Sequence, residues 1–141
     1  MNASPAEQLR LPLRVLVADD ADGVRELVML LLDMENDFTV VGQARDGVEA
    51  VDRARDLQPD LVVLDISMPR LDGITAIPRI LNASPTSRVA LFTGMAEVSV
   101  EAEARRAGAD AVLPKELGAT TLVDRLREVC RGPRGRMPSS A

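Results

Sequence analysis

Three aspartates, a threonine and a lysine stand directly after short apolar runs that are far apart in the sequence. These residues are Asp19, Asp20, Asp65, Thr93 and Lys115. Carboxylates that lie close together repel one another, and burial raises the cost of their charge. A hard divalent cation such as Mg²⁺, which prefers oxygen ligands, relieves that repulsion. A nucleophilic carboxylate, a metal ion, a lysine and a hydroxyl donor are together the groups needed to accept a phosphoryl group.

The element that must position this chemistry most closely is Leu61–Leu64, an apolar run that leads directly into Asp65. An unbroken apolar run followed by turn residues predicts a strand that is buried on both faces of a parallel sheet. Pro69 and the pair Asp72-Gly73 then predict a loop. Asp65 is therefore expected at the carboxyl end of a central strand, the edge where open α/β sheets bind their ligands.

Apolar runs and helical periodicities alternate along the chain. The predicted strands are Arg14–Ala18, Thr39–Val41, the run from Leu61, Val89–Thr93 and Ala111–Leu113. The predicted helices begin near Asp22, Asp46, Ile74, Ala96 and Thr120. Pro78 is expected to kink the third helix or to delay its start. The inward face of the first helix is predicted to carry Val24, Leu27, Val28, Leu31 and Leu32. Alternation of this kind implies right-handed crossovers and a parallel sheet with helices on both faces.

The predicted elements lie between residues 13 and 131, which we expect to form a single domain. Residues 1–12 are interpreted as an N-terminal leader. Residues 132–141, with their Pro, Gly and Ser content, are interpreted as a flexible tail or as a linker to an absent output domain.

Composition excludes several classes of function. The chain has no histidine, which excludes histidine-based acid–base catalysis and histidine-ligated metals. Its single cysteine, Cys130, can form no internal disulfide, which fits the reducing cytoplasm that we expect as its location. A net charge of -5 and an aromatic content of 1% disfavour direct binding of nucleic acid. No apolar run approaches the ~20 residues that span a membrane, so no membrane association is expected.

The chain resembles the receiver domain of two-component response regulators over about residues 13–131. The resemblance rests on four motifs, which are Asp19-Asp20, Asp65–Pro69 with Asp72-Gly73, Thr93-Gly94 and Leu113–Lys115. It implies an α/β fold of the flavodoxin-like (βα)5 type, a three-layer sandwich with a parallel sheet of order 2-1-3-4-5. The segment from Asp72 to Pro85 is also similar to the receivers of LuxR/NarL-type regulators.

Applied to the matching positions, the resemblance implies a role for each candidate site residue. Asp65 would be the phosphoacceptor, and Thr93 and Lys115 would bind the phosphoryl oxygens. Ser67 and Gly94 would complete the phosphoryl-binding set. The implied metal ion is Mg²⁺, with Asp20 and Asp65 as direct ligands and Asp19 acting mostly through water. The carbonyl oxygen of Ser67 would be a further ligand.

The resemblance also implies partners. A sensor histidine kinase would donate the phosphoryl group to this non-enzymatic switch, which would control an output domain or another partner. The surface expected to change and to form a homodimer comprises helix 96–107, strand 111–113 and helix 120–130. Val112 departs from the family, which often has Tyr or Phe there, and a short β-branched side chain cannot replace the swinging ring of an aromatic residue.

Three other functions are compatible with a nucleophilic aspartate or with the fold. A phosphatase of the haloacid dehalogenase type needs a second aspartate two residues after the nucleophile, where this chain has Ser67, so this function is disfavoured. A flavodoxin-like FMN carrier needs a phosphate-binding loop after the first strand, where the acidic segment Asp19–Asp22 would repel phosphate. A receiver-like module that binds partners without phosphorylation stays open at this stage.

Overall fold

The computed structural model of the protein describes residues 11–94 and 98–132. The strands are β1 (Leu13–Ala18), β2 (Phe38–Ala44), β3 (Leu61–Leu64), β4 (Arg88–Thr93) and β5 (Ala111–Pro114). The helices are α1 (Asp22–Asp33), α2 (Gly47–Leu57), α3 (Gly73–Ala83), α4 (Val98–Ala107) and α5 (Ala119–Arg131). The predicted start of the fourth helix at Ala96 lies outside the described residues, as do residues 1–10 of the leader and 133–141 of the tail.

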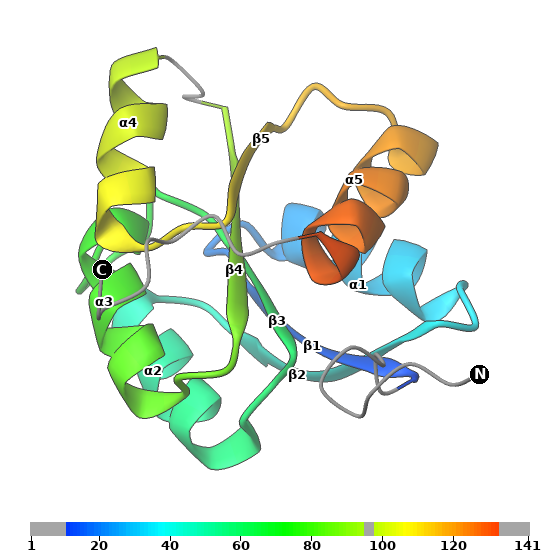
Figure 1. Ribbon diagram of the computed structural model, residues 1–141, viewed down its shortest axis with the longest axis horizontal. Coiled ribbons are helices and arrows are strands. Elements are labelled where there is room, and N and C mark those ends of the chain that lie inside the picture. Colours follow the sequence, from blue (N-terminus) through cyan, green and yellow to red (C-terminus); the bar gives the residue numbers. More distant parts are fainter. Residues whose placement is uncertain (1–10, 95–97, 133–141) are drawn as a thin grey trace.

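All five strands run parallel in one sheet of order β2-β1-β3-β4-β5. Helices α2, α3 and α4 cover one face of the sheet and α1 and α5 cover the other, so the molecule is a three-layer sandwich (Figure 1). The predicted α/β class and strand order are therefore confirmed. Because the strands are parallel, the loops that follow β1, β3, β4 and β5 leave the sheet at the same edge.

The central strand β3 is buried on both faces, as its unbroken apolar run predicted. Each residue from Leu61 to Leu64 is at most 2% exposed. Val62 and Leu64 belong to the apolar cluster under α2, α3 and α4, whereas Leu61 and Val63 belong to the cluster under α1 and α5. Successive strand side chains point to opposite faces of a sheet, which explains this alternation. Asp65 is therefore carried by a strand that is anchored in both layers of the core.

The inward face of α1 differs from the predicted one. Leu27, which was predicted to point inward, is 55% exposed, whereas Arg25 is only 2% exposed. The buried stripe runs through Arg25, Val28 and Leu32. The prediction failed because hydrogen bonds, which apolar periodicity does not detect, allow a guanidinium group to occupy an inward position.

Helix α3 does not start late, which was one of the two effects predicted for Pro78. It starts at Gly73 and contains Pro78, so a start delayed by the proline is wrong. The Asp72 carboxylate caps the first turn, because it accepts a hydrogen bond of 2.9 Å from the Thr75 N–H. This cap begins the helix directly after the loop that follows β3.

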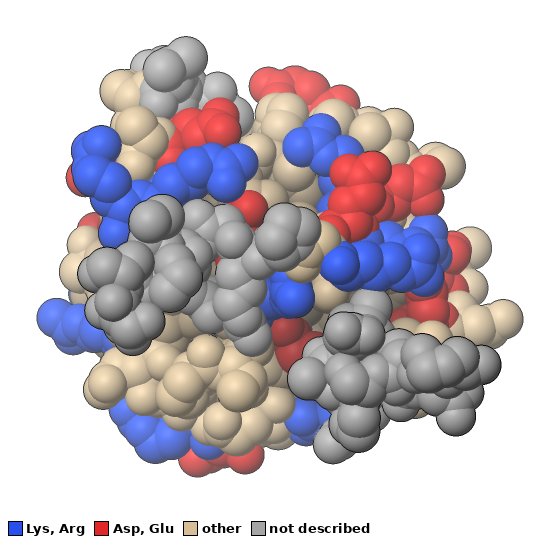
Figure 2. Space-filling model, viewed as in Figure 1, with Lys and Arg blue, Asp and Glu red and all other residues tan. Residues whose placement is uncertain are grey.

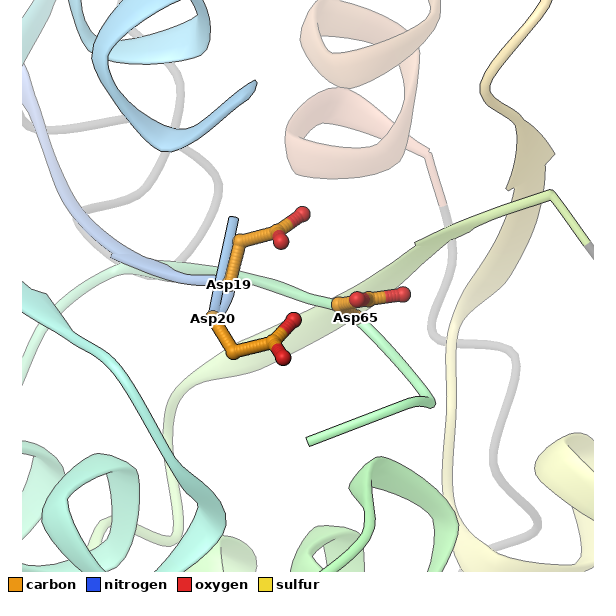
Figure 3. A group of neighbouring side chains, drawn as sticks. All are labelled: Asp19, Asp20 and Asp65. Carbon is orange, nitrogen blue, oxygen red and sulfur yellow. The ribbon is translucent and has the colours of Figure 1, made fainter. Parts of the chain in front are cut away.

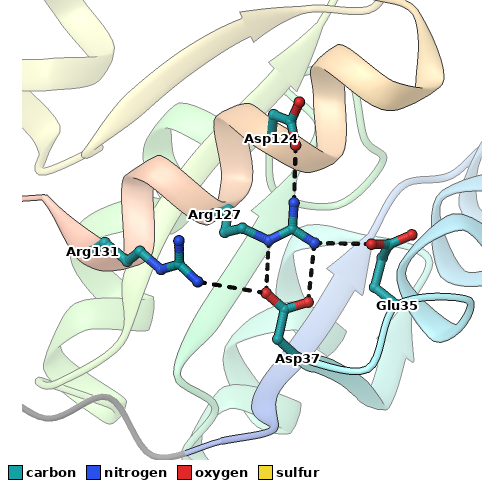
Figure 4. Close-up of polar contacts among 5 residues, drawn as sticks. All are labelled: Glu35, Asp37, Asp124, Arg127 and Arg131. Atoms are coloured by element: carbon teal, nitrogen blue, oxygen red, sulfur yellow. Dashed lines mark hydrogen bonds and ion pairs between the residues drawn. The ribbon is translucent and has the colours of Figure 1, made fainter.

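The two helices next to β5 in sequence are anchored very differently. Helix α5 buries four side chains, and its Arg127 binds the Asp37 carboxylate through two bonds of 2.6 and 3.0 Å and Glu35 through one of 2.9 Å (Figure 4). Among the side chains described for α4, only that of Ala104 is buried. An alanine buries little apolar area, so displacing α4 costs less free energy than displacing α5. None of the helices in the described ranges is long and apolar enough to cross a membrane.

Candidate functional site

Backbone hydrogen bonds just beyond the strand ends hold the predicted site residues at one edge of the sheet. The Asp65 N–H donates to the Ala18 carbonyl at 3.0 Å, which continues the pairing of β3 with β1. The Lys115 N–H donates to the Thr93 carbonyl at 3.0 Å, which continues the pairing of β5 with β4. The regular sheet therefore fixes the backbone from which these side chains project.

Three carboxylates gather at this edge. Asp19, Asp20 and Asp65 each place a carboxylate oxygen within 4.8 Å of the other two, and all three side chains point to the same side of the strand ends (Figure 3). Asp19 and Asp65 are buried, at 3% and 5% exposed, whereas Asp20 is exposed. The cluster is therefore buried at Asp19 and Asp65 and accessible to solvent at Asp20.

Lys115 binds both buried carboxylates. Its ammonium nitrogen lies 3.1 Å from Asp19 Oδ2 and 3.3 Å from Asp65 Oδ2. All other basic residues among the chain's 17 are arginine, so the only lysine of the protein stands at this site. A compact ammonium group can neutralise two neighbouring oxygens without the planar fork that a guanidinium would impose.

The pKa of Asp65 is raised above its ordinary value of 3.8, first because burial disfavours its charge and then because Asp19 repels it. Lys115 counteracts both effects only in part. Burial acts to lower the pKa of Lys115, but hydrogen bonds and charge attraction from Asp19 and Asp65 outweigh it, so that pKa is raised. One ammonium group therefore leaves the charge of the acidic cluster incompletely neutralised.

The donor set fits a hard divalent cation. Three carboxylates supply only oxygen ligands, and a site of a few carboxylates open to water suits Mg²⁺. The repulsion from Asp19, which together with burial raises the pKa of Asp65, is the repulsion that a bound cation would relieve.

The loop after β3 closes tightly over Asp65. A Cβ atom at Gly73 would lie 2.0 Å from the Asp65 carbonyl oxygen, a separation that no side chain tolerates. The Gly73 N–H also donates to the Ile66 carbonyl at 2.8 Å. The sequence predicted a turn at Asp72-Gly73, and the structure adds that glycine is required there because the start of α3 contacts the backbone of Asp65.

The other predicted residues occupy different parts of the same edge. Thr93 ends β4 and is 1% exposed. Ser67 is exposed in the loop after β3, and Gly94 is exposed directly after β4. A Cβ atom at Gly94 would meet nothing within 4 Å, so the fold itself does not require glycine at this position.

One residue next to the site escaped sequence reasoning. Arg25 donates from Nη1 to the carbonyl oxygen of Asp19 at 2.9 Å and is buried beneath the acidic turn. The only signal in the sequence is an arginine in the first turn of α1, three residues after Asp22, where a surface ion pair is the ordinary interpretation.

Comparison with known proteins identifies the family. Residues 15–127 match the response regulator receiver domain. This chain belongs to the response regulator receiver family. The match includes residues of all five strands, the three clustered aspartates, Thr93 and Lys115, so the resemblance inferred from the sequence motifs is confirmed.

Relatives of this receiver include both single-domain and longer proteins. It is 34% identical to the chemotaxis protein CheY of Thermotoga maritima over 120 residues, which cover 84% of this chain and 98% of the relative. It is 47% identical to protein-glutamate methylesterase/protein-glutamine glutaminase 4 of Myxococcus xanthus over 108 residues, 76% of this chain but only 31% of the relative. Among solved structures, the receiver domain of the putative response regulator NarL from Mycobacterium tuberculosis superposes with a TM-score of 0.83 at 29% identity, covering 88% of this chain and all of that one.

Proposed function

We propose that this receiver is a signalling switch that changes its surface when Asp65 accepts a phosphoryl group. The observation that carries the proposal is the placement of the Asp65 carboxylate beside a second buried carboxylate and an ammonium group that binds both. Such a site holds a nucleophile ready and offers positive charge to the incoming group. Membership of the receiver family supports the same function.

In the proposed reaction an oxygen of Asp65 attacks the phosphorus of a phosphohistidine on a sensor histidine kinase. The new bond joins Asp65 to phosphorus, the bond from phosphorus to the imidazole nitrogen breaks, and that nitrogen takes up a proton. Because this chain contains no histidine, the phosphohistidine must belong to a partner. In this reaction Asp65 is itself the acceptor and is left modified, so we propose no enzymatic activity for the chain.

The residues around Asp65 have separate roles in this proposal. The ammonium group of Lys115, which binds carboxylate oxygens in the free protein, binds phosphoryl oxygens after the transfer. The Thr93 hydroxyl group donates a hydrogen bond to another phosphoryl oxygen. Gly94 and Ser67, which are exposed at the same edge of the sheet, would complete the phosphoryl-binding set. Asp20 and Asp65 would hold Mg²⁺ directly, with Asp19 acting through water and the Ser67 carbonyl as another ligand. When bound, Mg²⁺ supplies the positive charge that balances the carboxylates and the transferred oxygens.

The output surface in this proposal is formed by α4, β5 and α5. The weak anchoring of α4 through Ala104 supports α4 as the part that moves, because α5 is held by a larger apolar face and by Arg127. Val112 on β5 is 8% exposed and packs in the same apolar cluster as Ala104. We propose that this surface binds an output domain or a partner and forms the homodimer of the activated protein.

Direct nucleic-acid binding is not part of this proposal. On the face drawn in Figure 2, basic side chains lie among acidic ones and form no continuous basic surface. Free, buried Cys130 agrees with the proposed cytoplasmic location. DNA binding, if the protein controls transcription, would belong to an output domain.

Amide NMR spectra with beryllofluoride, which mimics a phosphoryl group, test this switch. With Mg²⁺ present, we expect shifts at Asp65, Thr93 and Lys115 and along α4 and β5, with smaller shifts in α1. Asp65→Asn should show none of them. Shifts confined to α1 and α2, or an α4 that stays unperturbed, would contradict the proposed output surface.

A further inference from the structure

Among the residues that the structure describes, Arg25 has the largest of the almost completely buried side chains. Arginine is almost never buried without partners, because removing its charge from water costs several kcal/mol. Each of its three nitrogens donates a hydrogen bond, from Nε to Gln43 Oε1 at 2.7 Å, from Nη1 to the Asp19 carbonyl at 2.9 Å and from Nη2 to Asp22 Oδ1 at 2.6 Å. These bonds join α1, β2 and the turn after β1.

The acceptor on Asp19 belongs to the peptide bond that links Asp19 to Asp20. A peptide unit is planar, so holding its carbonyl oxygen also fixes the direction of the Asp20 N–H. The next peptide unit is held as well, because the Ala21 N–H donates to Asp19 Oδ1 at 2.9 Å. Both peptide units that flank Asp20 are thus tied down, the first by Arg25 and the second by the Asp19 carboxylate.

Within the described part of the chain, the carboxylate of Asp20 forms no hydrogen bond and no ion pair. Asp19, in contrast, is held at its N–H by the Ala44 carbonyl and at its carboxylate by Lys115 and Ala21. The direction of the Asp20 side chain therefore depends on its backbone, and that backbone depends on Arg25. Even so, an Asp20 oxygen lies within 4.8 Å of the oxygens of Asp19 and Asp65.

We propose that Arg25 is a positioning residue that fixes the Asp19–Asp20 peptide and so directs the Asp20 carboxylate into the metal-binding cluster before a cation arrives. This inference rests on the proposed Mg²⁺ site. Partners that orient metal ligands typically contribute 10- to 100-fold to metal affinity. We expect the loss of the Arg25 guanidinium to weaken Mg²⁺ binding by about tenfold.

The direction in which Mg²⁺ affinity changes distinguishes a positioning role of Arg25 from a purely electrostatic one. Arg25→Met removes a positive charge near a cation site, so electrostatics alone would make Mg²⁺ bind more tightly. Positioning predicts the opposite, because Asp20 loses its fixed backbone. Gln43→Met provides a second test with the charge intact. This substitution removes the acceptor of the Arg25 Nε hydrogen bond. Because Gln43 is exposed, the variant should fold normally. It should also bind Mg²⁺ more weakly than the wild-type protein, but by a smaller factor than Arg25→Met.

Titration with Mg²⁺, followed through the amide NMR shifts of Asp20 and Asp65, gives the dissociation constant of each variant. The titrations are made at a temperature where every variant is folded. Arg88→Met is the control, because Arg88 donates to the Val129 and Gly132 carbonyls at the opposite edge of the sheet. We expect Arg88→Met to lower the melting temperature and to leave the dissociation constant unchanged.

Unchanged or tighter Mg²⁺ binding in both Arg25→Met and Gln43→Met would overturn the role of Arg25 and leave the proposed function standing. If Arg25→Met does not fold, Gln43→Met alone decides. A wild-type protein whose spectrum does not respond to Mg²⁺ would instead overturn the metal site itself, and the role of Arg25 with it.

Discussion

Without divalent cations, the Asp65→Asn variant is expected to melt at a higher temperature than the wild-type protein. Folding raises the pKa of Asp65, through burial and through the charge of Asp19, so its ionised form destabilises the native state. An aspartate of this kind is most favourable at low pH and loses stability as the pH rises above 3.8. Asparagine avoids that loss. We expect a gain on the order of 1 kcal/mol at neutral pH, equivalent to about 4 °C, and almost none in acid.

Mg²⁺ should reverse this order. A cation that binds only the native state adds RT ln(1 + [L]/Kd), or about 2.7 kcal/mol at a hundredfold excess over Kd. The wild-type protein has the full set of carboxylates and should gain this stability, whereas Asp65→Asn should gain little. Thermal melts must be followed by circular dichroism, because the chain has no Trp and no Tyr.

Asp20→Asn is the matched control for these melts. Asp20 is exposed, so removing its charge relieves little of the repulsion between the buried pair. This variant should melt like the wild-type protein without Mg²⁺ and should fail to respond when Mg²⁺ is added. A wild-type protein that is more stable than Asp65→Asn in the absence of any cation would refute the electrostatic account of the cluster.

Replacing Lys115 by methionine is expected to destabilise the fold by about 1–3 kcal/mol at neutral pH, because two buried carboxylates lose their shared cation. Lys115 is itself 27% exposed, and solvent screening keeps the loss below that of a fully buried ion pair. The folded-state pKa of Lys115 is raised, so the stability it contributes is fully present below 10.5. The deficit of the variant should shrink in acid, where Asp65, whose pKa is raised, takes up a proton and no longer needs a cation.

Lys115→Arg is the corresponding control, because it keeps the charge and should retain most of the stability. Chemical denaturation at neutral and at acid pH measures both variants. If the deficit of Lys115→Met were equally large at both values of pH, its cause would be lost packing rather than lost charge.

The placement of the reactive residues could be predicted because a parallel sheet converts apolar runs into shared strand ends. Leu61–Leu64 placed Asp65 at the edge, and the same logic placed Asp19 and Lys115. Each of these predictions required only the type of an element and its direction, which strongly apolar runs specify well.

The features that could not be predicted depend on side-chain partners and on close contacts between distant segments. Arg25 points inward because Gln43, far away in the sequence, accepts its hydrogen bond, and Leu27 is exposed as a consequence of the same helix orientation. The steric need for glycine at position 73 arises from the backbone of Asp65. Periodicity records neither relation, since both exist only after the chain has folded.

Intact-protein mass spectrometry after incubation with acetyl phosphate tests the central claim most directly. With Mg²⁺ present, the wild-type protein should gain the mass of one phosphoryl group, as the Asp65 oxygen displaces acetate from phosphorus. Chelation of Mg²⁺ or the Asp65→Asn substitution should abolish that gain. A gain of the same size in Asp65→Asn, or none in the wild-type protein with Mg²⁺, would contradict the assignment of Asp65 as the phosphoacceptor.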